Sequence, residues 1–324
     1  MSELLLFIRL ITSFYLVLVF VSLQANECLL TWNDGFNKQA ILSFIECVSN
    51  PQLETFIPEQ ERIAVIDHDG TLWCEKPHYT QVSYILKKIE DLLPFPSDWL
   101  SNHPLKKAAT EQGINHELME LSLVTHMGLT VEQLTQSVKE FMSQTVHPRF
   151  GLTYDKMVYQ PMVELITLLH QKGFKVFIVS GGGIEFVRTI SEEAYQIPQE
   201  RVIGTSLQTW YIGEPTPHLI LVPLLVLPIN NGSGKPVNIQ RHIGRIPVLA
   251  IGNSDGDIEM LSYVQQSHRL SLSIFIHHDD EEREYCYDEG ATQLLKLVEE
   301  HPQWLKVSMK HDFKVIFPIQ TNNR

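Results

Sequence analysis

A short apolar run that ends in two closely spaced aspartates constrains this chain more than any other feature. The run is IAVI at 63–66, and DHDGT at 67–71 follows it directly. Four apolar residues bounded by turn-forming residues are typical of a strand that is buried on both faces. The same form recurs at 175–179, before the sequence SGGG, and at 247–251, before GNSDGD. The repetition predicts strands of a parallel sheet.

Helical patterns separate these strands, as an α/β fold requires. Apolar residues recur at helical spacing over 36–48 and 161–171, and a further strand is predicted at 270–276. Strand, glycine loop and helix form the repeating unit of a Rossmann-like parallel sheet. In such a sheet ligands bind beyond the carboxyl ends of the strands, so the polar loops are expected to converge there. The segment 207–233 reads either as paired strands or as an irregular excursion.

The charge of the chain restricts its partners. Lys and Arg total 25 against 38 Asp and Glu, which gives a formal charge of −13. We see no local basic patch, so nucleic acid is not an expected partner. An acidic enzyme can still bind an anionic substrate where a divalent cation and a few donors reverse the potential inside the cleft.

The N-terminal segment has the character of an export signal. Residues 4–23 are mostly apolar and lead to Ala25, after which cleavage of a signal peptide spanning 1–25 is expected. The alternative is an uncleaved membrane anchor, because the run is nearly long enough to span a bilayer. We therefore expect a periplasmic or secreted protein, without stable membrane association once the signal is removed.

Four cysteines would remain after cleavage. Cys28, Cys47, Cys74 and Cys286 form an even number, which permits disulfides in an exported chain without requiring any. Cys28 with Cys47 is the favoured pair, and four buried free thiols are the alternative.

Two carboxylates two residues apart at the end of a strand can divide the work of ester hydrolysis. Asp67 and Asp69 point roughly the same way, while His68 between them points elsewhere. One carboxylate can attack phosphorus, and the other can protonate the leaving oxygen and later deprotonate water. The alternative without chemistry is a strand-to-helix turn that uses Asp and Gly as cap and turn residues.

The sequence DHDGTL at 67–72 resembles the first motif, DxDGT, of the haloacid dehalogenase-like (HAD) hydrolases. The resemblance is to the phosphatase branch, since the second aspartate supplies the proton that an alkoxide needs and a halide does not. It implies Asp67 as nucleophile, Asp69 as acid and base, and the Asp69 backbone carbonyl as a metal ligand.

Two further sites resemble the second and third motifs of this family. Ser180, followed by Gly181, matches the hydroxyl residue that binds the phosphoryl group together with the next backbone N–H. Glycine lets the backbone approach an oxyanion closely. Lys235 matches the lysine that neutralises the attacking carboxylate and the phosphate; an ordinary surface lysine is its alternative.

The fourth motif departs from the family pattern GDxxxD. The sequence keeps Gly252 and Asp257 but has Asn253 at the first acidic position. An amide oxygen can ligate Mg²⁺, although with one negative charge less, unless Asp255 or Asp257 compensates. The resemblance thus implies Mg²⁺ as cofactor, with Asp67, Asp69, Asn253 and Asp257 as metal-site residues, the last as a direct or indirect partner.

The resemblance also implies the domain organisation. An N-terminal helix and the start of the core are expected at 26–74, an inserted helical cap of the phosphoserine phosphatase-like class at 75–155, and the rest of the core at 156–324. Glu75 lies near, but not in register with, the glutamate by which phosphoserine phosphatases contact the substrate amine. Several segments, DGTLWCEKP among them, look most like a bacterial subgroup of exported members, for which the motifs imply no substrate.

The expected function is Mg²⁺-dependent hydrolysis of a small phosphorylated metabolite through an aspartyl-phosphate. The alternatives are a phosphotransferase of the same fold and a non-catalytic protein that binds a phosphorylated ligand. His277 and His278 are not expected to share a metal, because adjacent side chains on an extended chain point apart. Trp73 is a candidate for lining the substrate pocket, or else a core residue.

Overall fold

The computed structural model describes residues 28–92 and 125–318. The predicted signal peptide at 1–25 lies outside these ranges, so its cleavage stays a prediction. Within the two ranges, none of the helices combines the length and the apolar character needed to cross a bilayer.

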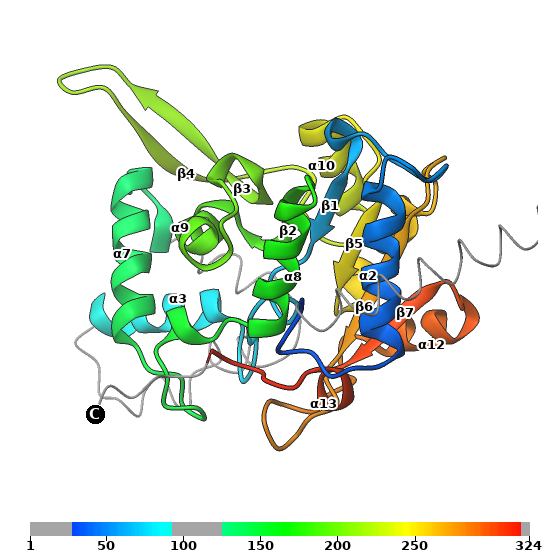
Figure 1. The fold of residues 1–324 in the computed structure, drawn as a ribbon. Coiled ribbons are helices and arrows are strands. Elements are labelled where there is room, and N and C mark those ends of the chain that lie inside the picture. The colour runs from blue at the N-terminus through cyan, green and yellow to red at the C-terminus, as the bar shows by residue number, and fades with distance from the viewer. Residues whose placement is uncertain (1–27, 93–124, 319–324) are drawn as a thin grey trace, which may run out of the picture.

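A largely parallel sheet forms the centre of the described chain, as the sequence predicts (Figure 1). Its strands are arranged in the order β4-β3-β2-β1-β5-β6-β7, and only β4 runs antiparallel to its neighbour. The strands are β1 (Ile63–Ile66), β2 (Lys175–Gly183), β3 (Val202–Ile212), β4 (His218–Val226), β5 (Leu249–Gly252), β6 (Leu272–His277) and β7 (Trp304–Ser308). All four predicted strands are present, as β1, β2, β5 and β6, and each starts within two residues of its predicted first residue.

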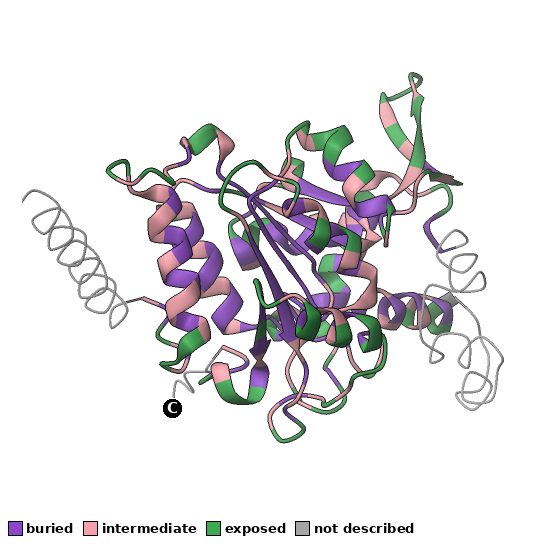
Figure 2. Ribbon diagram, turned by 90° about the vertical axis from the view of Figure 1, so that its right-hand side faces the viewer, coloured by how far each residue is buried: buried purple, intermediate pink, exposed green. Residues whose placement is uncertain are grey.

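Alternate residues of the central strands feed two separate cores. Ala64 and Ile66 of β1 pack into one core, whereas Val65 packs into the other. Helices α2 (Phe36–Ser49), α8 (Gln160–Gln171) and α9 (Ile184–Tyr195) belong to the first core. Helices α10 (Gly234–Ile243), α11 (Ile258–Val264) and α12 (Thr292–Glu300) belong to the second. Burial on both faces explains the continuous apolar runs of β1 and β5, and Figure 2 shows that the middle of the sheet is largely buried.

The described part of the predicted cap is largely helical. Its long helices are α3 (Thr80–Leu92) and α7 (Val131–Gln144). Helix α7 starts in a capping box, in which the Thr130 side chain accepts from the Gln133 backbone and Gln133 bonds back. The rest of the predicted helical stretch, residues 93–124, lies outside the described residues. The boundaries 26–74, 75–155 and 156–324 therefore stay a prediction.

The segment that the sequence left open forms an antiparallel ribbon. Strands β3 and β4 pair from Ser206 opposite Val226 to Ile212 opposite His218. Figure 1 shows this ribbon projecting beyond the helices, and Figure 2 shows its far end exposed. Of the two alternatives, paired strands are thus the one that the structure has. The C-terminal part of the described chain ends with the short helix α13 (Met309–Asp312).

All four cysteines are free thiols in the structure. The favoured Cys28–Cys47 disulfide is not formed, and the alternative of unpaired thiols holds. The alternative also expected all four thiols to be buried. Only Cys74 is buried, and Cys286 is exposed.

Candidate active site

Three adjacent strands bring the four sequence motifs to one edge of the sheet. Asp67 and Asp69 follow β1, Gly181 lies near the end of β2, and Asn253 follows β5. Lys235 reaches the same place from the first turn of α10. The polar loops converge beyond the carboxyl ends of the strands, as the fold class predicts.

Lys235 is the centre of a buried ionic network. Its ammonium group donates to Asp67 Oδ1 at 2.5 Å, to Asp257 Oδ1 at 2.5 Å and to the backbone carbonyl of Val179 at 2.8 Å. Three acceptors use all three N–H bonds, and the side chain is only 2% exposed. Lys235 is therefore not a surface lysine, which removes the alternative raised by the sequence.

Attraction between Lys235 and the two carboxylates opposes the effect of burial. Burial lowers the pKa of Lys235, but the carboxylates of Asp257 and Asp67 outweigh it and raise that pKa. Burial and the Asp257 charge raise the pKa of Asp67, and Lys235 acts in the opposite direction. The ammonium group thus favours the ionised form of the nucleophile candidate.

Asp69 lies in an environment that suits an acid and base. Burial is the main reason that its pKa is raised to about 6, and the nearby Glu75 charge adds to the rise. The indole N–H of Trp73 donates to Asp69 Oδ1 at 2.8 Å and lowers the pKa in part. Trp73 is fully buried and does not line the cavity, so of the two alternatives the core residue is the one that the structure has, and its indole holds Asp69 in place.

The glycine-rich end of β2 presents backbone to the cavity. Gly181, Gly182 and Gly183 line it, while Ser180 is fully buried and its Oγ accepts from Gly182 N at 3.0 Å. Gln81 of α3 reaches across, and its Oε1 accepts from Gly183 N at 2.8 Å. A helix of the predicted cap region is therefore bonded directly to the predicted phosphate loop.

A second side chain, that of Asn230, supports the glycine-rich end of β2. Asn230 is fully buried, and its Nδ2 donates to the carbonyls of Ser180 and Ile203 at 2.8 and 3.2 Å. It thereby ties the end of β2 to β3. No local pattern indicates this role, because Asn230 lies 50 residues from Ser180 along the chain.

Oxygen atoms gather where the resemblance implies a metal. With its oxygen towards Asp67 and Asp69, the Asn253 amide lies 2.9 Å from the Asp69 carbonyl oxygen and 3.3 Å from Asp67 Oδ2; turned over, its Nδ2 would donate to the same two atoms. Carboxylate, carbonyl and amide oxygens are suitable ligands for Mg²⁺. In the described ranges no cluster of three or more His, Cys, Asp or Glu side chains forms a metal site. The donor set described here instead mixes side-chain and backbone oxygens.

Asp257 supports this set from behind. Its Oδ1 binds Lys235, and its Oδ2 accepts from Asn253 N, Ser254 N and Ser254 Oγ at 3.0 to 3.1 Å. The residue is fully buried and both carboxylate oxygens are engaged. In this arrangement Asp257 fixes the loop that carries Asn253 and orients Lys235, which corresponds to the indirect role foreseen for it.

The two adjacent histidines serve different contacts. His277 pairs with Asp288 at 2.8 Å, whereas the buried His278 lies between the Gly70 carbonyl at 2.7 Å and Glu284 at 3.2 Å. Burial lowers the pKa of His278, but the Glu284 partner outweighs it and raises that pKa. His278 therefore braces the loop that carries Asp67 and Asp69.

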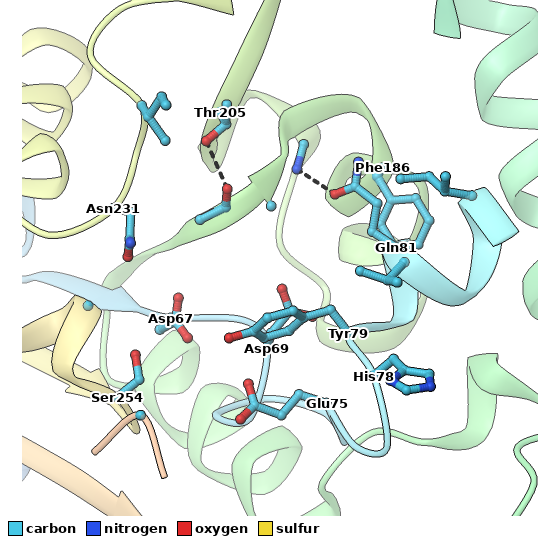
Figure 3. A pocket seen from close by; sticks show the side chains of 18 of the residues that line it. Asp67, Asp69, Glu75, His78, Tyr79, Gln81, Phe186, Thr205, Asn231 and Ser254 are labelled. Carbon is cyan, nitrogen blue, oxygen red and sulfur yellow. Dashed lines mark hydrogen bonds between the residues drawn. The ribbon is translucent and has the colours of Figure 1, made fainter. Parts of the chain in front are cut away.

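A cavity of about 660 Å³ opens in front of these groups. Figure 3 shows the carboxylates of Asp67, Asp69 and Glu75 and the ring of Tyr79 directed into it. The wall away from the carboxylates is apolar, and its side chains include Val82, Ile85, Leu134, Phe186, Leu221 and Leu225. This volume is typical of pockets that bind whole small molecules.

The comparisons with known proteins agree with this architecture. Residues 64–262 match the family model of the haloacid dehalogenase-like hydrolases, and the chain belongs to this family. The match runs from the first motif past the fourth, which confirms the resemblance and the hydrolase class. Comparison with curated proteins gives no match.

Solved structures share the fold at low sequence identity. A functionally unknown protein of Anaerococcus prevotii has a TM-score of 0.54 and 14% identity, over 83% of this chain and 91% of its own. A protein of unknown function from Bordetella pertussis has a TM-score of 0.52 and 14% identity, over 76% and 98%. A phosphoserine phosphohydrolase-like protein of Francisella tularensis has a TM-score of 0.40 and 20% identity, over 72% and 92%. Together with the sheet order, the first two support the Rossmann-like core.

Proposed function

We propose that this hydrolase is a Mg²⁺-dependent phosphatase that cleaves phosphomonoesters through an aspartyl-phosphate on Asp67. The observation that carries the proposal is the Lys235–Asp67 pair at 2.5 Å beside Asp69, at the mouth of one cavity. A carboxylate held by an ammonium group beside a second carboxyl of raised pKa supplies a nucleophile and a proton donor together. A strand-to-helix turn, the alternative without chemistry, would not require a buried lysine from another helix beside the two aspartates.

In the first step the Asp67 carboxylate forms a bond to phosphorus while the ester P–O bond breaks. The departing oxygen takes the proton of Asp69, whose pKa of about 6 keeps a protonated fraction near neutral pH. In the second step Asp69 takes a proton from water as the water oxygen attacks phosphorus. The aspartyl P–O bond then breaks, and Asp67 returns to its carboxylate form with release of phosphate.

The remaining groups position and stabilise the phosphoryl oxygens. Lys235 and the backbone N–H groups of the glycine loop face negative charge that develops on these oxygens. The Asp67 carboxylate, the Asp69 carbonyl and Asn253 would hold the cation, which neutralises phosphate charge when bound. We propose Ser180 and Gly181 as the phosphate-binding pair, with Ser180 acting through the buried contact to Gly182 N.

The decisive experiment compares wild-type protein with Asp67→Asn on a panel of phosphomonoesters that includes p-nitrophenyl phosphate. We expect phosphate release that requires Mg²⁺ and falls by at least about a thousandfold in the variant, because the nucleophile is lost. Equal release by both proteins would refute the proposal. Added alcohols separate the alternatives: a phosphotransferase yields a new phosphoester, and a binding protein yields neither product.

We also propose that the protein acts outside the cytoplasm. The support is the apolar segment at 4–23 followed by Ala25 in the sequence. The test is mass spectrometry of protein recovered from the periplasm or the medium, with Asn26 expected as first residue. Recovery of an intact N-terminus in the membrane fraction would instead indicate an anchor, and recovery from the cytoplasm would refute export.

A further inference from the structure

The Asn253 departure raises the question of where the missing negative charge of the metal site lies. The sequence offered Asp255 and Asp257 as compensating residues, and the structure engages both elsewhere. Asp257 binds Lys235 and the backbone of its own loop. Asp255 Oδ1 accepts from the backbone N–H groups of Gln293 and Leu294 at the start of α12. Neither carboxylate bonds to the side-chain amide of Asn253.

Glu75 is the carboxylate that does reach this amide. Its Oε1 accepts from Asn253 Nδ2 at 3.5 Å and from the hydroxyl of Tyr287 at 2.7 Å. Glu75 is 7% exposed and Asn253 3%, so water competes little for this contact. Figure 3 shows Glu75 beside Asp69.

The glycine of the first motif makes room for this approach. A Cβ on Gly70 would lie 2.0 Å from Asn253 Nδ2 and 2.8 Å from Glu75 Cδ. Gly70 also has a φ of +73°, which side chains other than glycine rarely adopt. The motif thus permits direct approach of the two side chains over its backbone.

Glu75 and a bound cation together decide which way the side-chain amide faces. Without a cation, the reverse orientation lets Nδ2 donate to the Asp69 carbonyl oxygen at 2.9 Å and to Asp67 Oδ2 at 3.3 Å, both shorter than the 3.5 Å contact to Glu75. With Nδ2 towards Glu75, Oδ1 faces the Asp69 carbonyl and Asp67 Oδ2, where three oxygens repel each other unless a cation lies among them. Turned over, the amide would place its oxygen against the Glu75 carboxylate. The Thr71 hydroxyl, 3.0 Å from the amide, can donate or accept and so favours neither orientation.

We infer that Glu75 is a positioning residue for the metal site: it orients Asn253 so that the amide oxygen faces the cation, and it places beside the site the charge that Asn253 lacks. The inference rests on the proposed metal-dependent function. It assigns Glu75 to the cation and not to a substrate amine, the group contacted by the glutamate of phosphoserine phosphatases with which Glu75 is not in register. Contacts of this kind behind a metal ligand typically change metal affinity by 10- to 100-fold.

The test measures Mg²⁺ binding by calorimetry without substrate, so that the readout does not depend on turnover. We expect Glu75→Gln to weaken Mg²⁺ binding by at least about tenfold. Glu289→Gln is the matched control, because Glu289 lines the same cavity but is exposed to solvent. We expect it to stay within about twofold of wild type, since solvent screens that charge.

A charge exchange distinguishes positioning from general damage. In the double variant Glu75→Gln with Asn253→Asp, the new amide at position 75 can donate to the new carboxylate at position 253, and the net charge is that of wild type. We expect Mg²⁺ affinity to recover to within about threefold of wild type. Circular dichroism on all variants verifies that they are folded.

Three outcomes would overturn the inference. They are equal Mg²⁺ affinity of wild type and Glu75→Gln, equal losses in Glu75→Gln and Glu289→Gln, and a double variant as weak as Glu75→Gln. A raised KM with unchanged Mg²⁺ affinity would assign Glu75 to the substrate instead. Mg²⁺ binding that depends on Glu75 in a protein without phosphatase activity would keep this inference and refute the proposed function, whereas a wild-type protein that binds no Mg²⁺ refutes both.

Discussion

Removing the positive charge of Lys235 should reveal how much the buried network contributes to the fold. Lys235→Met keeps a long unbranched side chain but leaves Asp67 and Asp257 facing each other without a cation, at 6% and 0% exposure. Breaking a buried ion pair on one side costs about 3–5 kcal/mol, because a desolvated charge stays behind. That is a large part of the 5–15 kcal/mol by which a typical protein is stable.

The assay is urea denaturation in the presence of EDTA at pH 8 and pH 5. Burial and the Asp257 charge raise the folded-state pKa of Asp67 above the ordinary 3.8, and in the variant Lys235 no longer opposes them. The penalty is therefore complete above this raised pKa and shrinks as the pH falls through it and Asp67 takes up a proton. We therefore expect the deficit in unfolding free energy to be larger at pH 8 than at pH 5. The double variant Lys235→Met with Asp257→Asn should recover part of it at pH 8, since one stranded charge is gone. A deficit under about 1 kcal/mol at pH 8, or one that grows towards pH 5, would refute this account of the network.

Two further predictions concern the frame around the site. His278→Gln should lower the unfolding free energy by about 1.5–3 kcal/mol, because it removes a charged hydrogen bond to Glu284. The raised pKa of His278 makes this contribution complete below 6.5 and lost at higher pH, and the lowered pKa of Glu284 makes it fade below 4.5. Urea denaturation of wild type and variant should thus show the largest difference in unfolding free energy between pH 4.5 and pH 6.5. A difference that stays constant up to about pH 9 would contradict the pairing of His278 with Glu284. Gly234→Ala should lower the unfolding free energy by about 1–3 kcal/mol in thermal or urea denaturation, because its Cβ would lie 1.9 Å from the Ile229 carbonyl oxygen. Gly35→Ala is the control and should be near neutral, because its Cβ would meet nothing within 4 Å. Equal effects of the two substitutions would contradict this account of the packing.

The parts of the fold that were predictable are those in which local pattern and burial agree. β1 and β5 are buried on both faces, so their apolar runs mark them directly, and the motif residues follow at their ends. The sequence does not decide the β3–β4 ribbon, because Pro223 interrupts the apolar run at 219–227 and a proline inside a run argues against a central strand. The ribbon is an exposed antiparallel pair, with Trp210 of β3 53% exposed.

The sequence predicts the site residues that belong to the four motifs. Asp67, Asp69, Lys235 and Asn253 come together as the motif order implies. The supporting contacts depend on tertiary structure: Glu75 meets Asn253 across 178 positions, and His278 meets the Gly70 carbonyl across 208. No spacing rule along the chain reports such pairs, which is why Asp257 and Asp255 were considered as compensating charges and Glu75 was not.

The bond from Gln81 to Gly183 N has a consequence for redesign of the pocket. It links the helix that forms one wall of the cavity to a main-chain atom three residues after Ser180, so a shift of α3 pulls on the end of β2. Enlarging the pocket through Val82 or Ile85 would therefore disturb the end of β2, where we propose that the phosphate binds, as well as the wall. Substitutions at Leu134 or Leu225, which line the cavity from α7 and β4, leave that bond untouched. Substitutions on α3 would thus change the cavity wall and the proposed phosphate site together, whereas substitutions on α7 or β4 would change the wall alone.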